Sequence, residues 1–431
     1  MREDIRERIV QIQQGKIPTG YQQTKAGLMP NDWGPMRAAS EIFTNYSDKK
    51  HDGIGVVLSA TQDRGIMPRS EVEIYIKYDE DNLYGYKKVQ PGSFIISLRS
   101  FQGGIEYSTY EGLVSPAYTV LKSILPIADN YYRNYFKTTD FVNRLNSATY
   151  GIRDGKQIGY QDFKTLILHY PPLPEQQKIA EILSHCDKVI DLKKQLIEEE
   201  RNRKKWLMQN LLNPDSGIRL PGFKGKWKES KLGDIFEFGP SLSASRAELG
   251  DKGICYLHYG DIHGNSSTAV DVGAEFDTLP KISLANPGIE MLHHGDVVFV
   301  DASEDYDGAS KYIVVINPNN IPFLPGLHTI PAKSKIDALD INFKKYCFQV
   351  YAFKKQVSFY VSGMKVYGLN KNNLAKIIIV YPDKKEQKAI AMLFITTDAK
   401  ITLLEQELAQ WQQKKKALMQ LLLNGIVRVS V

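Results

Sequence analysis

The sequence predicts an α+β protein in which two pseudo-symmetric globular domains of mixed helix and strand are separated by two long antiparallel helices that form a coiled coil. The first observation is a gapless repeat: residues 170–213 match residues 381–424 at a constant offset of 211, with about 18 of 44 positions identical. The second is an apolar period of seven residues in both copies, which is typical of a coiled-coil seam. The third is that about 160 residues precede each copy, as expected after a tandem duplication.

Composition bounds the class of protein. The chain has 431 residues, of which 42% are hydrophobic and 24% charged, as in globular proteins of two or three domains. Its three cysteines are far apart and form no C-x-x-C motif, so we expect reduced thiols and a cytoplasmic location. No long apolar run occurs, so neither a signal peptide nor a membrane span is expected. A net charge of +6 permits a polyanionic partner without requiring one.

The repeats divide the chain into five predicted segments. Residues 9–17 resemble the repeat end at residues 418–426, which makes the chain quasi-cyclic; a short frayed amphipathic helix explains them nearly as well. The segments are an N-terminal helical segment that completes the repeat (1–19), a first globular domain (20–169), a first helical repeat (170–215), a second globular domain (216–380) and a second helical repeat (381–428).

Each repeat copy is predicted to be one long helix. At about 38 residues and about 1.5 Å per residue it would run about 57 Å, too long for one globular domain to cover. The two seams are therefore expected to bury each other in an antiparallel pair; the alternative is two unrelated amphipathic helices that pack on their own domains. The predicted seam residues are Ile179, Leu183, Ile190, Leu207 and Leu211 in the first copy, and Ile390, Phe394, Ile401, Leu404, Leu408, Trp411, Leu418 and Leu422 in the second.

Within each domain a glycine precedes an apolar, β-rich run, at residues 92–99 and 295–302. Each run predicts a buried strand that ends in a polar loop. Residues 163–169 and 374–380 are strand-like runs that lead into the repeats. The loops between landmarks differ, since residues 100–111 have no counterpart in residues 303–311. Two recognition modules with different targets would show this pattern, and so would drift after duplication.

Several motifs resemble those of specificity subunits from type I restriction-modification systems. They are Pro171-Pro-Leu-Pro-Glu-Gln-Gln-Lys-Ile-Ala-Glu-Ile-Leu183, Lys205-Trp-Leu-Met-Gln-Asn-Leu-Leu212, Pro221-Gly-Phe with Trp227, and Leu232-Gly-Asp-Ile235. Together with the duplication and its spacing they cover almost the whole chain. The second copy departs from the pattern, because Asp383-Lys-Lys385 replaces the Pro-Leu-Pro of the first.

The resemblance implies that the two globular domains are target-recognition domains, each reading half of a bipartite, asymmetric site in double-stranded DNA. It implies that the two helices set the gap between the half-sites and dock two methyltransferase subunits, which methylate adenine N6. Two restriction-translocase subunits can join. S-adenosylmethionine, ATP and Mg²⁺ are expected on those partners, whereas this chain is expected to bind no cofactor, metal or membrane.

The resemblance also implies a non-catalytic subunit, and the motifs agree. The Asn/Asp-Pro-Pro-aromatic loop of amino-methyltransferases is absent, since Asn213-Pro-Asp and Asn317-Pro-Asn are the nearest approaches, and no phosphate-binding G-x-x-x-x-G-K-S/T occurs. Pro382-Asp383 with Glu386 and Lys388 superficially resembles a nuclease motif, but the spacing is too short to hold a metal from separate strands. No spacing supports a zinc site built on Cys255, His258 and His263 with His293 and His294.

DNA reading needs base-contacting side chains on exposed loops and cations for phosphates. The candidates are Arg99 and Gln102 in the first domain, Asp301, Ser303 and Lys311 in the equivalent loop of the second, and Arg153 with Lys365 as matched phosphate contacts. Each is individually explained as well by a solvated surface residue. Two alternative functions stay open: a coiled-coil scaffold that binds two proteins and no DNA, and a recognition arm separated from a fused restriction-methylation enzyme.

Overall fold

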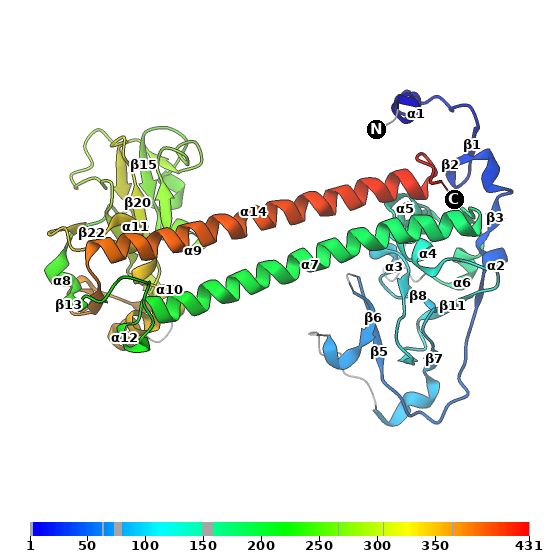
Figure 1. The fold of residues 1–431 in the computed structure, drawn as a ribbon, viewed down its shortest axis with the longest axis horizontal. Coiled ribbons are helices and arrows are strands. Elements are labelled where there is room, and N and C mark those ends of the chain that lie inside the picture. The colour runs from blue at the N-terminus through cyan, green and yellow to red at the C-terminus, as the bar shows by residue number, and fades with distance from the viewer. Residues whose placement is uncertain are drawn as a thin grey trace. The chain divides into compact units, whose positions relative to one another are not determined.

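The computed structural model describes residues 3–62, 64–72, 80–148, 158–265, 267–304, 306–363 and 366–430. The chain forms two compact units, Met1–Lys194 with Gln406–Val431, and Gln195–Glu405 (Figure 1). Each unit combines helices and sheets with one half of each of two long helices, which confirms the predicted α+β class. The unit boundaries fall inside the long helices, so each half-helix is packed as part of a domain.

The first unit is built on a four-stranded antiparallel sheet in the order β4-β11-β8-β9. Its elements before the long helix are α1 (Glu3–Gln13), β1 (Tyr21–Thr24), β2 (Gly27–Pro30), η1 (Asn31–Trp33), β3 (Arg37–Ala38), α2 (Ala39–Ile42), β4 (Phe43–Asn45), β5 (Leu58–Thr61), β6 (Gly65–Pro68), η2 (Arg69–Glu71), η3 (Glu80–Gly85), β7 (Lys87–Val89), β8 (Phe94–Ile96), α3 (Ser100–Gly103), β9 (Glu106–Tyr107), β10 (Gly112–Val114), β11 (Thr119–Ser123), α4 (Asp129–Tyr135), α5 (Thr139–Ser147), α6 (Tyr160–Phe163) and β12 (Ile167–Leu168).

Aromatic side chains fill the core of the first unit. Phe43 contacts the rings of Phe94 and Tyr132 at centroid distances of 5.4 and 5.1 Å, both edge-on, a favoured geometry for aromatic pairs. Ile179 and Leu423 from the long helices belong to the same buried cluster. The domain core and the helix ends are therefore one packed body within this unit.

The second unit has a five-stranded sheet in the order β14-β22-β18-β20-β16, in which only β16 and β20 run parallel. Its elements are η4 (Pro214–Ser216), β13 (Lys228–Lys231), α8 (Leu232–Ile235), β14 (Phe236–Phe238), η5 (Arg246–Glu248), β15 (Ile254–Leu257), α9 (Tyr259–Gly264), β16 (Ala269–Asp271), β17 (Lys281–Ile282), β18 (Val297–Val300), β19 (Ala302–Ser303), α10 (Tyr306–Ala309), β20 (Tyr312–Ile316), β21 (Phe323–Pro325), β22 (Thr329–Ser334), α11 (Ile341–Cys347), α12 (Tyr351–Tyr360), β23 (Tyr367–Gly368), α13 (Lys371–Leu374) and β24 (Ile378–Tyr381).

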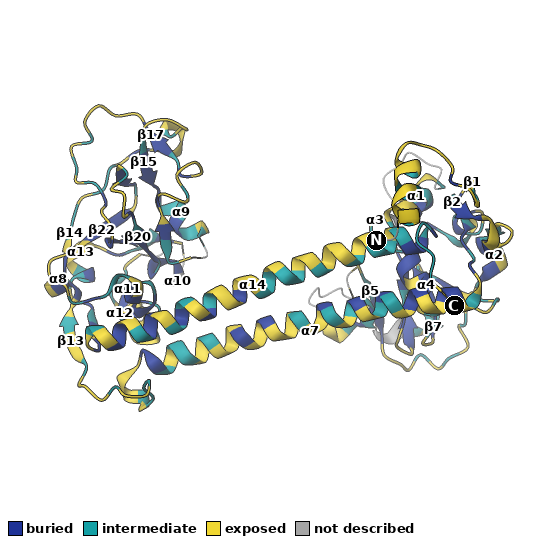
Figure 2. Ribbon diagram, turned by 45° about the horizontal axis from the view of Figure 1, so that its top comes forward, coloured by how far each residue is buried: buried dark blue, intermediate teal, exposed yellow. Residues whose placement is uncertain are grey.

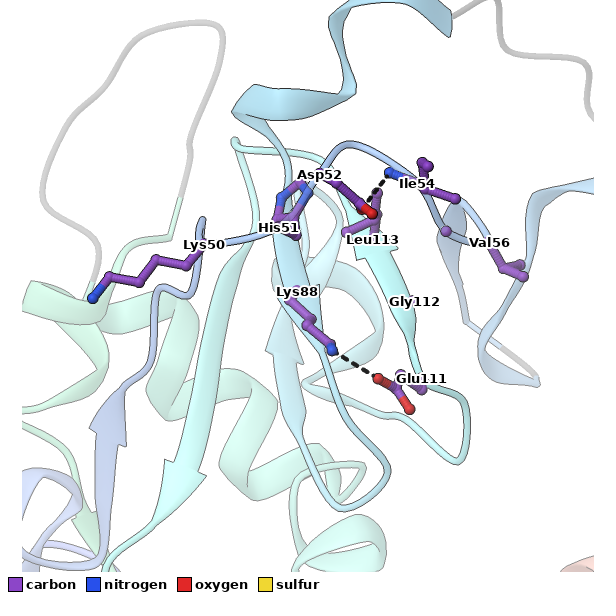
Figure 3. Close-up of a pocket in the computed structure, with 10 residues that line it drawn as sticks. Lys50, His51, Asp52, Ile54, Val56, Lys88, Glu111, Gly112 and Leu113 are labelled. Atoms are coloured by element: carbon purple, nitrogen blue, oxygen red, sulfur yellow. Dashed lines mark hydrogen bonds and ion pairs between the residues drawn. The ribbon is translucent and has the colours of Figure 1, made fainter.

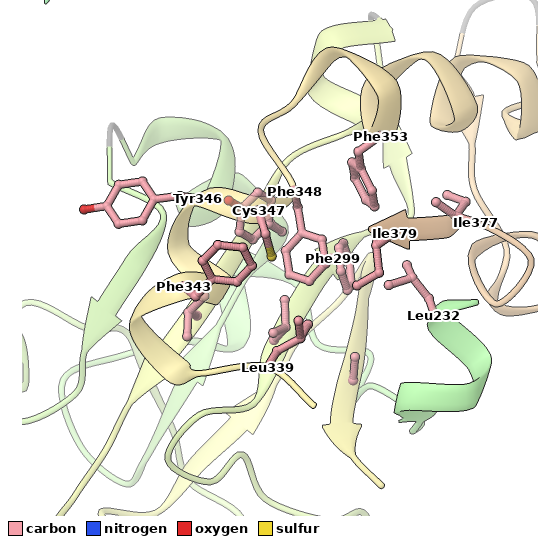
Figure 4. Packing of buried hydrophobic residues seen from close by; sticks show 14 of the residues in the cluster. Leu232, Phe299, Leu339, Phe343, Tyr346, Cys347, Phe348, Phe353, Ile377 and Ile379 are labelled. Atoms are coloured by element: carbon pink, nitrogen blue, oxygen red, sulfur yellow. The ribbon is translucent and has the colours of Figure 1, made fainter. Parts of the chain in front are cut away.

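Phe299, Phe348 and Phe353 pack together at the centre of the second unit (Figure 4). Ile390 and Phe394 from the long helix α14 join this cluster. The predicted strands within residues 92–99 and 295–302 are β8 and β18, both fully buried. They are equivalent in position, since β8 pairs antiparallel with β11 and β18 pairs antiparallel with β22.

The strand-like runs before the repeats were predicted too long. Phe163 ends the short helix α6 and Leu374 ends the short helix α13, and the strands begin only at Ile167 and Ile378. Phe163 and Leu374 are fully buried, so their apolar character reflects packing of a helix end against the core. Apolar runs of four to seven residues do not distinguish a strand from a buried helical turn.

The long helices are α7 (Leu173–Leu211) and α14 (Lys384–Leu423), of 39 and 40 residues. Within each unit they run antiparallel, because two ion pairs in each unit show the residue numbers in contact falling on α14 as they rise on α7. In the first unit Asp187 pairs with Lys415. In the second unit Lys204 pairs with Asp398, the repeat equivalent of the first pair. Every predicted seam residue is buried or half-buried, and Figure 2 shows buried and exposed residues alternating along both helices.

Candidate nucleic-acid interface

A buried glutamate lies near the start of each long helix, Glu175 in α7 and Glu386 in α14. The Arg428 guanidinium donates to both carboxylate oxygens of Glu175, at 2.7 and 2.8 Å. The Arg219 guanidinium likewise donates to both carboxylate oxygens of Glu386. Each arginine lies in the segment that follows the other long helix, so the start of each long helix is joined to the segment after its partner. Two-pronged arginine–carboxylate pairs are strong and orientation-specific.

The glutamine that follows each of these glutamates forms a hydrogen bond with the domain that precedes its helix. Gln176 accepts a hydrogen bond from the backbone N–H of Ala128 at 3.0 Å, just before α4. Gln387 accepts from the backbone N–H of Asp340 at 2.7 Å, just before α11. The repeated Glu-Gln pair thus has a structural role in both units, because the glutamine joins each domain to the start of its long helix.

In the first unit, the loop after β8 carries Arg99 and Gln102, both exposed, as the sequence predicted for polar residues at a strand end. Arg99 directly precedes α3, and the backbone N–H of Gln102 donates to the Arg99 carbonyl at 2.9 Å. The Gln102 amide oxygen accepts from the amide of Gln62 at 3.2 Å. Gln62 was not predicted, because it lies in a hairpin turn 40 residues earlier.

In the second unit, Asp301 directly follows β18 and accepts a hydrogen bond from His328 Nδ1 at 3.0 Å. His328 precedes β22, and its φ of 58° lies in the left-handed region that a histidine seldom adopts. The two side chains line an open depression of about 510 Å³ together with Asn370 and Lys371. A loop histidine beside a carboxylate can donate and accept hydrogen bonds, which suits recognition of base edges.

Other predicted residues of the second unit have different surroundings. Ser303 is buried, with 7% of its surface exposed, in the pairing of β19 with β23, so its position is structural. Lys311 is half-buried and donates to the His263 carbonyl at 2.7 Å. Arg153 and Lys365, the predicted phosphate contacts, lie outside the described residues.

A second depression in the first unit, of about 540 Å³, was not predicted (Figure 3). Lys50, His51 and Asp52 line one side, and an ion pair between Lys88 and Glu111 at 2.9 Å lines the other. His51 is held by its ring nitrogens, which contact the Tyr86 carbonyl and the Gly53 N–H. The polar residues before Gly53 could have indicated a loop at this place, because clusters of polar residues mark loops.

Titration behaviour at the loops follows from burial. Burial and the hydrogen bond to Asp129 raise the pKa of Tyr107, on β9, to about 12. Burial lowers the pKa of His258, whose ring centroid lies 4.6 Å from that of Tyr259.

In the part of the chain that the structure describes, no group of three His, Cys, Asp or Glu side chains is placed to hold a metal ion.

Comparison with known proteins gives a consistent result. The family model for the type I restriction modification DNA specificity domain matches residues 39–199 and 224–413. The type I restriction enzyme MjaVIII specificity subunit of Methanocaldococcus jannaschii is 26% identical over 330 residues, which are 74% of this chain and 75% of that protein. The MjaX specificity subunit of the same organism is 27% identical over 279 residues, 63% of this chain and 62% of its own length.

Among solved structures, a chain from a study of complex assembly and conformational transition in the type I restriction-modification system has a similar fold. It is 14% identical, with a TM-score of 0.54, and the match covers 96% of this chain and all of that one.

Among the described helices, none is long and apolar enough to cross a membrane.

Proposed function

We propose that this chain, which belongs to the type I restriction modification DNA specificity family, is a DNA-recognition subunit whose two domains read the two different halves of a bipartite site. One observation carries the proposal: equivalent strand ends present different chemical groups. Arg99 and Gln102 follow β8, whereas Asp301 follows β18 and pairs with His328. Arginine and glutamine suit the edges of guanine and adenine, and a carboxylate accepts from cytosine N4, so the half-sites differ.

The experiment is to co-express the chain with its methyltransferase subunit and to map the methylated sequence in genomic DNA. Asp301→Ala is expected to relax one position of one half-site, with about 10- to 100-fold less discrimination there, since a good base contact is worth about 1–3 kcal/mol. The other half-site and the spacer should not change. Asp337→Ala, an exposed carboxylate in the same unit, is the matched control. Loss of preference in both half-sites would contradict independent reading by the two domains.

The proposed partners are two methyltransferase subunits, one on each repeat. Support comes from four residue pairs that are identical in both copies although both members are exposed: Leu192 with Leu403, Gln195 with Gln406, Lys205 with Lys416, and Gln209 with Gln420. Packing within the chain does not explain why such positions match. Two copies of one partner, bound to equivalent surfaces, would explain it. Two restriction-translocase subunits are proposed to join the same assembly.

Native mass spectrometry of the co-purified complex tests this stoichiometry. The expected ratio is two methyltransferase subunits per chain, and Leu192→Asp is expected to lower it to one while Leu403 still binds the other copy. A single methyltransferase subunit in the unsubstituted complex would contradict the proposal.

The chain itself is proposed to be non-catalytic, with S-adenosylmethionine, ATP and Mg²⁺ bound by its partners. Support comes from the missing methyltransferase and phosphate-binding motifs. The two long helices are proposed to set the spacer between half-sites. Lengthening both helices by one equal helical segment is expected to lengthen the spacer without changing either half-site, and a changed half-site would refute this role.

A further inference from the structure

We propose that Gln62 and Gln102 act together as an adenine-reading pair in the first domain, with Gln62 fixing the Gln102 amide for contact with the purine edge in the major groove. The inference rests on the proposed function and names a specific base reader within it. Its starting point is the hydrogen bond from Gln62 Nε2 to Gln102 Oε1, 3.2 Å long, between two exposed side chains.

The two glutamines come from separate loops that the fold brings together. Gln62 lies in the turn between β5 and β6, and Gln102 lies in α3 after β8. Their contact therefore depends on the tertiary structure, because 40 residues separate them in sequence. The hairpin is placed by a bridge between Ile66 and Ser108. A Cβ at Gly65 would lie only 2.9 Å from the Tyr107 carbonyl oxygen, so the hairpin backbone approaches β9 closely.

The backbone beneath Gln102 is equally fixed. A Cβ at Gly103 would lie 3.2 Å from Cγ of Gln62, so the Gln62 side chain rests against that glycine. The Gly103 carbonyl accepts from Lys137 Nζ at 2.9 Å, and Lys137 also pairs with the buried carboxylate of Glu106. At Gly104, with a φ of 81°, any side chain would collide with the Phe136 carbonyl. The loop that carries Gln102 is thus built on buried contacts.

The chemistry of the pair suits adenine. An amide with one acceptor and one donor side by side matches adenine N6–H and N7, and this two-pronged contact is a recurrent way of reading adenine. Gln102 Oε1 keeps a second lone pair after accepting from Gln62, and the NH₂ group of the same amide supplies a donor. Because Gln62 holds the amide in one orientation, less side-chain entropy is lost when the base binds.

Charge and exposure favour DNA at this surface. Arg99 lies three residues before Gln102, and Arg64 lies two residues after Gln62, both on the exposed side of these loops. Cations beside a base-reading group supply the attraction to phosphates that positions a protein on the duplex. In the second domain the equivalent strand end carries the Asp301–His328 pair, so the amide pair belongs to the first domain's half-site alone.

The test uses the full chain co-expressed with its methyltransferase subunit, with the methylated sequence mapped in genomic DNA and with binding measured on duplexes that carry single base changes. Gln102→Ala is expected to lower discrimination about 10- to 100-fold at one adenine of one half-site. Gln62→Ala is expected to give a smaller loss at the same adenine, and the double variant should match Gln102→Ala. Gln23→Ala, an exposed glutamine on β1, is the control and should change nothing.

Unchanged discrimination at every adenine in Gln102→Ala would overturn the proposal. A uniform loss of affinity on all sequences would also overturn it. If the thermal midpoint of the variant equals that of the unsubstituted chain, such a loss would assign the pair to phosphate binding. If the midpoint is lower, the loss would assign the pair to folding. If the unsubstituted complex showed no sequence preference at all, the proposed function itself would fail. A bipartite preference that survives both glutamine substitutions would refute only the adenine-reading pair.

Discussion

At the residue scale, burial controls the charge of His169, between the first domain and the end of α14. His169 is fully buried, and its Nδ1 contacts the Leu423 carbonyl oxygen at 3.1 Å, so Nδ1 carries the proton of a neutral ring. The ring centroids of Trp33 and Tyr135 lie 5.4 and 5.5 Å from the centroid of the His169 ring. Burial lowers the pKa of His169 from 6.5 to about 4, because a charged imidazole loses its hydration there.

The first unit is therefore expected to lose stability in mild acid. Between pH 6.5 and 4 the unfolded chain binds a proton at His169 that the folded chain does not, so stability is complete above pH 6.5 and falls as the pH approaches 4. From pH 7.5 to pH 5 the loss from this residue is about 2 kcal/mol. Denaturant unfolding of the wild type and of His169→Leu checks it.

The variant should be less stable at neutral pH, because the contact with Leu423 is lost, but its stability should fall less between pH 7.5 and 5. His185→Gln, at an exposed position on α7, serves as the matched control and should keep the wild-type slope. Parallel pH curves for the wild type and His169→Leu would rule out this role for His169.

At the element scale, the length of a pattern decides what sequence reasoning can find. A seven-residue period sustained over about 40 residues predicted α7 and α14 because every turn repeats the signal. The four-residue helices that end at Phe163 and Leu374 carried no such signal. Gln62 and His328 were missed for a different reason: their partners, Gln102 and Asp301, are set by sheet pairing between distant segments. Local sequence does not record such neighbours.

The repeated ion pairs between the long helices allow a quantitative prediction. Lys415 Nζ lies 2.5 Å from Asp187, with side chains that are 21% and 45% exposed, so the pair is partly screened by water. Asp187→Lys is expected to destabilise the first unit by about 1 kcal/mol, and adding Lys415→Asp should recover about 0.5 kcal/mol. Chemical denaturation of the four chains of this double-mutant cycle measures the coupling. A coupling energy of zero would mean that water screens the pair fully.

The equivalent pair in the second unit gives an internal comparison. Asp398 also accepts a hydrogen bond from the Tyr346 hydroxyl at 3.0 Å, so exchanging Asp398 and Lys204 should recover less than the Asp187 exchange. Equal recovery at the two sites would show that the tyrosine contact contributes little.

At the scale of the whole molecule, each half of the chain carries both kinds of partner for two of the ion pairs between the long helices and for the arginine–glutamate clamps. Asp187 and Lys204 lie in the first half; the partner of Asp187 is Lys415, the repeat equivalent of Lys204, and the partner of Lys204 is Asp398, the repeat equivalent of Asp187. Glu175 and Arg219 are likewise in the first half, and the clamps on Glu175 and Glu386 have the same form. Two copies of residues 1–226 can therefore reproduce these contacts, because each copy supplies the partner residues that the second half of the chain supplies in the full protein.

We expect residues 1–226 to form a symmetric dimer that, with methyltransferase, selects an inverted repeat of the first domain's half-site. Three of the described ion pairs between the long helices do not carry over: in a dimer, Arg201 would face Lys194 instead of Glu405, and the pairs Lys193–Glu407 and Glu200–Lys400 would lose a charge. The dimer should therefore be weak, and Lys194→Glu should strengthen it by replacing a repulsion with an ion pair. Sedimentation over a concentration series measures both forms, with Lys204→Glu as the variant that should dissociate. A monomer at every concentration, with and without Lys194→Glu, would contradict the view that the repeats alone encode the pairing.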